Sequence, residues 1–189
     1  QELDVQKIRK DFPMLQNQNL IYLDSSATSQ KPYSVIRAVT DFYENCNANP
    51  LRGLYETAQN ATEKYEAARE KVRQFIHAKS TEEIIFTRNA TESLNLVAYS
   101  YGLMAFQPGD EILASIMEHH SDMLPWQQAA KRTGAVVKYL ECDRQGRITE
   151  EDLRNAITDK TKLVAVTQVS NVLGVRNDIR AFAKICHEK

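Results

Sequence analysis

Apolar positions recur along this chain with two different spacings. Four short apolar runs predict strands over residues 84–87, 111–115, 136–140 and 163–167. After an amphipathic opening helix, apolar residues three and four apart predict helices over residues 33–46, 58–75, 90–101, 121–132 and 179–186. A further helix is expected after Thr149, because Asp152 follows three residues later as in a capping box. Strands that alternate with helices predict an α/β fold with a mainly parallel sheet.

The composition narrows the class of protein without identifying it. With 42% hydrophobic residues and a net charge of −1, the chain can bury one good core and has no excess positive charge for nucleic acid or an anionic membrane. We expect neither a bilayer-spanning segment nor a secretory leader, because the sequence shows no apolar run of either kind. Cys46, Cys142 and Cys186 are widely spaced and odd in number, which indicates reduced thiols in a cytoplasmic protein.

Polar turns follow three of the predicted strands. They cover residues 88–95, 116–126 and 168–174, and the second carries two histidines and an acid. An open α/β sheet binds its ligand outside the carboxyl ends of its strands. We therefore expect the three turns to form one ligand site.

The first turn has the features of a phosphate site. Ala90 and Thr91 stand where a helix starts, and a helix start presents unsatisfied N–H groups and the positive end of the helix dipole. Small side chains and a hydroxyl suit a phosphate. The alternative reading is that Thr91 only caps the helix.

The second turn suits an aromatic ligand better than a metal. His119 and His120 are adjacent, so their side chains point in different directions, and no third zinc ligand appears at useful spacing. An imidazole can lie flat against an aromatic ring and has a tunable proton. A histidine that is only hydrogen-bonded at a strand end remains an alternative. Trp126 is expected in the core.

Two further side chains could bind polar groups. Asn171 stands in a turn closed by Gly174, and its amide can both donate and accept. Arg52 lies beside Gly53 in a loop and could hold a carboxylate or phosphate with two hydrogen bonds. Ordinary turn chemistry for Asn171 and a solvated surface charge for Arg52 remain open.

Together these segments resemble the amino-terminal half of the SufS-type cysteine desulfurases, which belong to the class V aminotransferase group of fold-type-I PLP-dependent enzymes. The resemblance runs from about Phe12 to the last residue. The matching segments, in order, are YLDSSATSQKP (22–32), RG (52–53), FTRNATESLN (86–95), MEHH (117–120) with PW (125–126), and VSNVLG (169–174).

The resemblance implies a fold and a set of contacts. The fold would be a three-layer sandwich, with an N-terminal helical arm over residues 1–20 and part of the PLP-dependent transferase large domain over residues 21–189. Ala90 and Thr91 would hold the phosphate of pyridoxal 5′-phosphate (PLP), and His119 would stack on its pyridine ring. The remaining implied contacts are Asn171 with the phenolic oxygen, Gln168 nearby, Ala27 near the substrate carboxylate, and Arg52 at the dimer-related mouth of the site.

The implied activity is removal of sulfur from L-cysteine, which gives L-alanine and an enzyme persulfide for iron–sulfur cluster assembly. The implied partners are a second copy of the enzyme and a sulfur acceptor of the SufU or SufE kind. The family's Schiff-base lysine, its pyridine-pairing aspartate and its persulfide-forming cysteine would all lie beyond Lys189, together with a small domain. We therefore expect the chain to be a fragment with no catalytic residue of its own, and to be inactive alone.

Two departures from the SufS pattern keep relatives of the same family open. Leu51 stands where a histidine usually precedes the Arg-Gly pair, and the phosphate turn reads Asn-Ala-Thr in place of Gly-Thr-Thr. Selenocysteine lyase and cysteine sulfinate desulfinase are the alternatives within the family. A non-catalytic α/β module that binds a phosphate ligand or another subunit is the alternative outside it.

Overall fold

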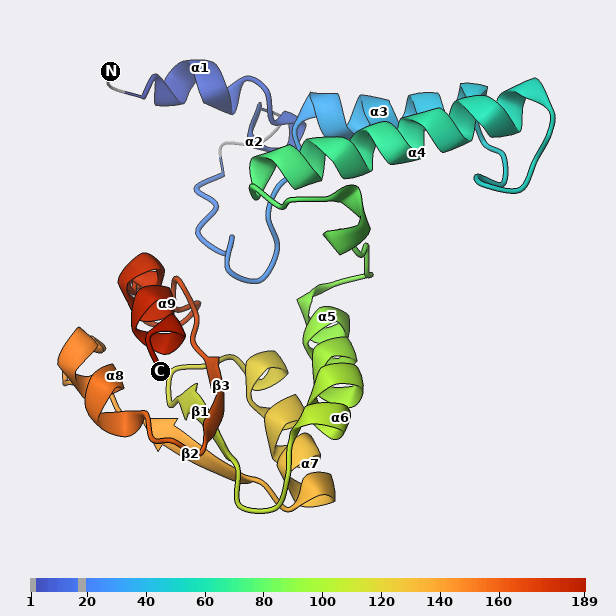
Figure 1. Cartoon of the computed structure of the whole chain (residues 1–189). Coiled ribbons are helices and arrows are strands. Elements are labelled where there is room, and N and C mark those ends of the chain that lie inside the picture. Colours follow the sequence, from blue (N-terminus) through green and yellow to red (C-terminus); the bar gives the residue numbers. More distant parts are fainter. Residues whose placement is uncertain (1–2, 17–19) are drawn as a thin grey trace. The chain divides into compact units, whose positions relative to one another are not determined.

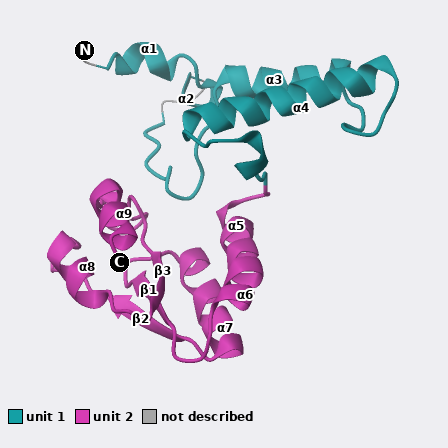
Figure 2. Ribbon diagram, in the orientation of Figure 1, with its two compact units in different colours: residues 1–86 teal, residues 87–189 magenta. Residues whose placement is uncertain are grey.

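The computed structural model describes residues 3–16 and 20–189, and the chain forms two compact units, residues 1–86 and 87–189 (Figure 2). The helical arm expected over residues 1–20 therefore lies partly outside the described residues. Where it is described, it contains two short helices rather than one. The helices of the first unit are α1 (Val5–Arg9), α2 (Pro13–Gln16), α3 (Tyr33–Asn45), α4 (Glu56–Phe75) and the 3₁₀ turn η1 (Thr81–Glu83) (Figure 1).

The strand expected over residues 84–87 does not form. Ile84–Phe86 runs without regular structure, and no described residue pairs with it as a strand. Arg69 of α4 fixes this segment instead, by donating to the carbonyl oxygen of Ile84 and by placing its guanidinium 5.2 Å from the ring centroid of Phe86. The prediction was wrong because a strand needs a neighbouring backbone as well as an apolar run.

The second unit is built on a parallel sheet. Its strands are β1 (Glu111–Ser115), β2 (Val136–Leu140) and β3 (Thr161–Ala165), in the order β2-β1-β3 (Figure 1). Both neighbours of β1 run parallel to it. The α/β class and the parallel sheet are therefore confirmed, with β3 beginning and ending two residues earlier than predicted.

Helices cover both faces of this sheet and make three layers. Successive side chains of a strand point to opposite faces. Accordingly, Ile112 of β1 packs in a cluster with Trp126 of α7 (Leu124–Thr133), whereas Leu113 packs with Leu153 of α8 (Glu150–Ala156) and Ile185 of α9 (Ile179–His187). All five residues of β1 are buried, as expected for a strand that is covered on both sides. The core position predicted for Trp126 is confirmed.

The ends of several helices differ from the prediction in informative ways. The helix expected over residues 90–101 is α5 (Ala90–Val97), followed by a π-helical turn, η2 (Ala98–Gly102), and by α6 (Leu103–Ala105). The helix expected from residue 121 begins as a 3₁₀ turn, η3 (His120–Asp122). The capping box at α8 is confirmed, because Asp152 N donates to Thr149 Oγ1 at 3.1 Å and Thr149 N donates to Asp152 Oδ2 at 2.8 Å.

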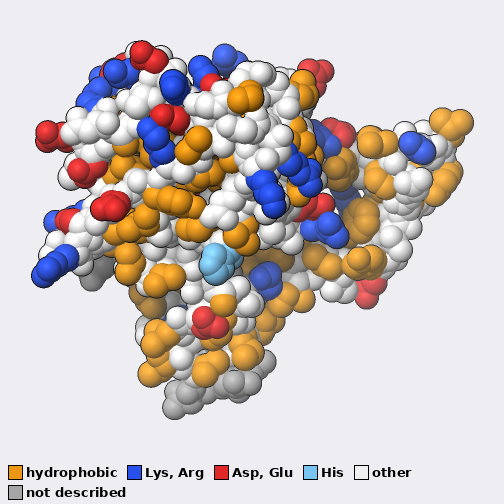
Figure 3. Space-filling model, turned by 90° about the horizontal axis from the view of Figure 1, so that it is seen from below, with side chains coloured by type: hydrophobic (Ala, Val, Ile, Leu, Met, Phe, Trp, Pro, Cys, Tyr) orange, Lys and Arg blue, Asp and Glu red, His pale blue; other side chains and the backbone are white. Residues whose placement is uncertain are grey.

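The surface of the molecule carries many hydrophobic side chains. In Figure 3, hydrophobic side chains lie between charged groups across the face that is shown. Exposed hydrophobic side chains of the second unit include Ile116, Leu124, Val172 and Leu173. No helix within residues 3–16 and 20–189 is long and apolar enough to cross a membrane. All three cysteines are free thiols.

Candidate functional site

Two polar turns leave the sheet side by side in the second unit. Because β1 and β3 are adjacent and parallel, the chain that follows each strand emerges at the same edge. A hydrogen bond joins the two turns there: the backbone N–H of Thr167 donates to Glu118 Oε1 at 2.8 Å. His119 follows Glu118 and Gln168 follows Thr167, so this bond brings together two residues that the sequence selected.

Glu118 is a buried carboxyl group at the centre of this arrangement. Its side chain is almost wholly enclosed, and Ser115 Oγ donates to Oε1 at 2.5 Å. Burial is the main cause that raises the pKa of Glu118 to about 7, and the neighbouring carboxyl of Asp122 adds to the rise. The hydrogen bonds from Ser115 and Thr167 oppose the rise because they stabilise the carboxylate. Glu118 is therefore partly protonated near neutral pH.

His119 has a fixed ring orientation at the start of η3. Its Nδ1 accepts a hydrogen bond from the backbone N–H of Ser121 at 3.1 Å and lies 2.9 Å from Ser121 Oγ. A neutral His119 therefore carries its proton on Nε2. The side chain is exposed, and its ring is tilted by 55° to that of His120, with the centroids 6.2 Å apart. The two imidazole rings therefore do not lie parallel or stack on each other, in agreement with the prediction that the adjacent side chains point in different directions.

The start of α5 supplies backbone donors. Asn89 is the N-cap, with its Oδ1 accepting from Glu92 N at 2.9 Å, so the alternative reading of Thr91 as the cap is wrong. Ala90 and Thr91 form the first turn and are exposed. Amide groups in a first turn have no acceptor within the helix, which leaves them available to an anion.

Two contacts set the surroundings of this helix start. Arg88 binds Glu92 with 3.0 Å between Nη2 and Oε1, which compensates the carboxylate in the first turn and lowers the pKa of Glu92. The helix α5 also contacts η3, the 3₁₀ turn that follows His119.

The third turn is a tight loop held from within. Val169 bridges to Arg176 as an antiparallel pair, and the N–H of Gly174 donates to the carbonyl oxygen of Ser170 at 2.9 Å. Gly174 has a φ of 67°, which favours glycine at this position. Asn171 is exposed at this turn. Both readings of Asn171 remain compatible with this position.

Buried Asn177 fixes the base of the same loop. Its Nδ2 donates to the carbonyl oxygen of Thr167 at 2.8 Å, and its N–H donates to that of Gln168 at 2.9 Å. The backbone of Gln168 is therefore held in place while its side chain is exposed.

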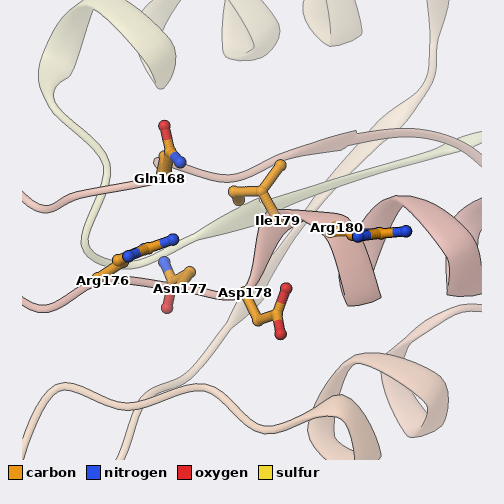
Figure 4. Close-up of a pocket in the computed structure, with 6 residues that line it drawn as sticks. All are labelled: Gln168, Arg176, Asn177, Asp178, Ile179 and Arg180. Atoms are coloured by element: carbon orange, nitrogen blue, oxygen red, sulfur yellow. The ribbon is translucent and has the colours of Figure 1, made fainter.

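Gln168 also lines a cavity of about 250 Å³ at the start of α9. In Figure 4, Gln168 lies on one ribbon segment, and the other lining residues lie on the segment that leads into α9. These are Arg176, Asn177, Asp178, Ile179 and Arg180. Asp178 caps α9 by accepting from the N–H of Ala181 at 3.1 Å. Neither arginine was selected from the sequence, where each stands in no motif.

Ala27 and Arg52 belong to the first unit. Ala27 is exposed in a turn in which its N–H donates to the carbonyl oxygen of Asp24 at 3.2 Å. Arg52 is exposed in a loop where the preceding residue, Leu51, has a φ of 71° and donates its N–H to Thr62 Oγ1 at 2.8 Å. The roles expected for these two residues remain predictions.

The residues that organise the site were missed by sequence reasoning. Ser115, Glu118 and Asn177 are polar, buried and bonded to the turns, but they do not face solvent as ligand-binding groups do. The one available signal was polarity at the end of an apolar strand, which marks Ser115 and Glu118 as groups needing a buried partner.

Comparisons with known proteins agree with this architecture. The family model for aminotransferase class-V matches residues 21–189. A probable cysteine desulfurase of Halalkalibacterium halodurans is 50% identical over 189 residues, which cover 98% of this chain and 47% of that protein. The chain therefore spans about half the length of this relative.

Solved structures give the same result. The apo structure of a cysteine desulfurase from Thermococcus onnurineus NA1 matches all of this chain and 46% of its own, with a TM-score of 0.91 and 40% identity. The cysteine desulfurase CsdA from Escherichia coli matches all of this chain and 47% of its own, with a TM-score of 0.85 and 38% identity. The fold is that of part of the large domain of fold-type-I PLP-dependent transferases, and the chain belongs to the class V aminotransferase family.

Proposed function

We propose that this chain is part of a PLP-dependent cysteine desulfurase of the SufS type, which takes sulfur from L-cysteine and leaves L-alanine and an enzyme persulfide for iron–sulfur cluster assembly. The observation that carries the proposal is the bonded pair of turns after β1 and β3, together with the contact between α5 and η3. The identity to probable and solved cysteine desulfurases supports the choice of substrate.

The groups around these turns fit PLP. The first-turn amides of Ala90 and Thr91 and the hydroxyl of Thr91 suit its phosphate, and the exposed imidazole of His119 offers a flat face to its pyridine ring. The amide of Asn171 can donate to the phenolic oxygen, with Gln168 nearby. When bound, PLP supplies the electron sink for bond cleavage at the amino acid.

The chain's own residues orient the cofactor and control one proton. Because Ser121 N–H occupies Nδ1, His119 holds its proton at Nε2 and keeps its ring plane fixed. We propose that Ala27 lines the pocket beside the substrate carboxylate and that Arg52 lies at the dimer-related mouth of the site, where the guanidinium can bind a carboxylate.

We propose that the 189 residues alone do not turn over cysteine. Among their thiols, Cys46 is buried, and burial raises the pKa of Cys186. A thiol with a raised pKa is a poor nucleophile at neutral pH. Incubation with PLP and L-cysteine is therefore expected to yield no L-alanine above a protein-free control, whereas L-alanine formed in proportion to protein would contradict this.

The proposed assembly is a cytoplasmic homodimer that passes sulfur to a SufU- or SufE-like acceptor. Exposed hydrophobic side chains such as Ile116, Val172 and Leu173 support burial against further protein.

Ligands without an aldehyde test the phosphate site directly. Pyridoxine 5′-phosphate and pyridoxine differ in the phosphate, and neither reacts with surface lysines. We expect calorimetry to show tighter binding of the phosphorylated ligand. Asn89→Asp keeps the helix cap but adds a negative charge, so it should weaken that binding by about fivefold or more, whereas Asn89→Ser should stay within about twofold. Equal affinity for the two ligands, or equal effects of the two variants, would refute the phosphate site.

A further inference from the structure

We propose that Glu118 is a positioning residue, whose side chain ties the turn after β1 to the turn after β3 and so fixes His119 relative to Gln168. The inference rests on the proposed function and deepens it, because it names the group that holds two cofactor-facing residues in register. Glu118 touches neither cofactor nor substrate in this role.

The backbone pairing of the sheet does not extend to the two turns. The paired residues of β1 and β3 end at Ala114 and Ala165, before either turn begins. Beyond that point, Glu118 Oε1 accepts from Thr167 N at 2.8 Å. This hydrogen bond thus extends the connection between the two strands past the end of their ladder.

Glu118 is itself held on the β1 side. Ser115, the last residue of β1, donates its hydroxyl to the same Oε1 at 2.5 Å, and Ser115 Oγ accepts from Met117 N at 3.2 Å. Ser115 is fully buried, so this anchor does not compete with solvent. One carboxylate oxygen therefore receives donors from both sides of the junction.

The carboxyl group of Asp122 connects the same turn to α7. Asp122 lies close enough to Glu118 to raise its pKa, and Asp122 Oδ1 accepts from Nε1 of the buried Trp126 at 2.8 Å. The turn that carries His119 is thus fixed at both of its ends, to β1 through Ser115 and to α7 through Trp126. On the other side, Asn177 holds Thr167 and Gln168 by their carbonyl oxygens.

Amide exchange measures the junction without any cofactor. In the 189-residue chain, Glu118→Ala removes the acceptor of the Thr167 N–H and should accelerate its exchange by about tenfold or more. Glu118→Gln keeps an acceptor oxygen, and its NH₂ group can donate to Asp122, so exchange should stay within about threefold of wild type. Amides of β1 such as Leu113 serve as internal references.

The matched control is Glu111, a second buried glutamate, which belongs to the strand that precedes Glu118. Glu111 lies at the opposite end of β1, where it binds Lys138 at 2.6 Å and accepts from Thr158 Oγ1 at 2.7 Å. Glu111→Ala should leave the Thr167 amide unchanged. If Glu118→Ala does not fold, Glu118→Asp carries the same test, because its shorter side chain keeps the charge but draws the oxygens back from Thr167.

Ligand binding then separates this inference from the proposed function. Glu118→Ala should weaken pyridoxine 5′-phosphate binding by about fivefold or more, with Glu118→Gln restoring it. Unchanged Thr167 exchange in Glu118→Ala, or an equal acceleration in Glu111→Ala, would overturn the positioning role. Failure of the wild-type chain to bind the ligand would instead refute the proposed function, while the exchange rates would still decide whether Glu118 joins the turns.

Discussion

Buried Glu118 and exposed His119 are sequence neighbours with opposite tasks. The carboxyl group of Glu118 is enclosed and satisfied by Ser115 and Thr167, while the imidazole of His119 projects from the same turn. Side chains that face a ligand depend on such enclosed partners for their geometry. The sequence could indicate His119 as a ligand-binding group, but the role of Glu118 required the position of a residue 49 places further along the chain.

The pKa of Glu118 makes the stability of the fold depend on pH. Its value of about 7 exceeds the usual 4.5, so the folded chain binds this proton more tightly than the unfolded chain does. The resulting stabilisation is complete below about pH 4.5 and is lost as the pH rises to about 7. Glu118→Gln removes this dependence. Relative to wild type, the variant should be more stable at pH 8 than at pH 5 by about 2 kcal/mol, allowing for partial solvent screening.

Urea unfolding at pH 5 and pH 8 measures this difference. Glu111→Gln provides a control without a pH effect in this range. The hydrogen bond from Lys138 lowers the pKa of Glu111 below the usual 4.5, so its stabilisation is lost only as the pH falls below that value, and the variant should differ from wild type equally at pH 5 and pH 8. A Glu118→Gln difference that is the same at both pH values would show that Glu118 is not preferentially protonated in the folded chain.

At the scale of elements, the sequence patterns predicted those strands and helix starts that depend on nearby residues. The apolar runs gave β1 and β2 with their observed bounds, and Thr149 with Asp152 gave the start of α8. The failed strand at residues 84–87 and the π-helical turn at Ala98–Gly102 depend on distant contacts. At Gly102, for example, the position that a Cβ would take lies 3.6 Å from the Cβ of Ala129 in α7, so this turn packs closely against a helix further along the chain.

The capping box of α8 offers a test at this scale. Thr149→Ala removes the acceptor of the Asp152 N–H and should cost about 1 kcal/mol of unfolding free energy. Thr149→Ser keeps the hydroxyl and should lie within about 0.5 kcal/mol of wild type. Chemical denaturation of the three proteins gives the comparison, and a cost shared by the serine variant would point to the lost methyl group instead of the cap.

At the scale of the whole molecule, the second unit combines a three-layer core with a polar edge. The sequence predicted the parallel sheet and the polar turns after β1 and β3, because strand–helix alternation is visible in one chain. It did not predict how the turns are joined, because Glu118 and Thr167 meet only in the folded sheet. Solved cysteine desulfurases that are about twice as long share the fold of this chain.

The most direct test of the account is whether the three turns respond together to one ligand. Backbone NMR spectra of the 189-residue chain would be recorded during a titration with pyridoxine 5′-phosphate. We expect saturable shifts, with one common dissociation constant, at five residues: Ala90, Thr91, His119, Gln168 and Asn171. Shifts confined to one turn, or different constants for different turns, would contradict a single cofactor site at the carboxyl edge of the sheet.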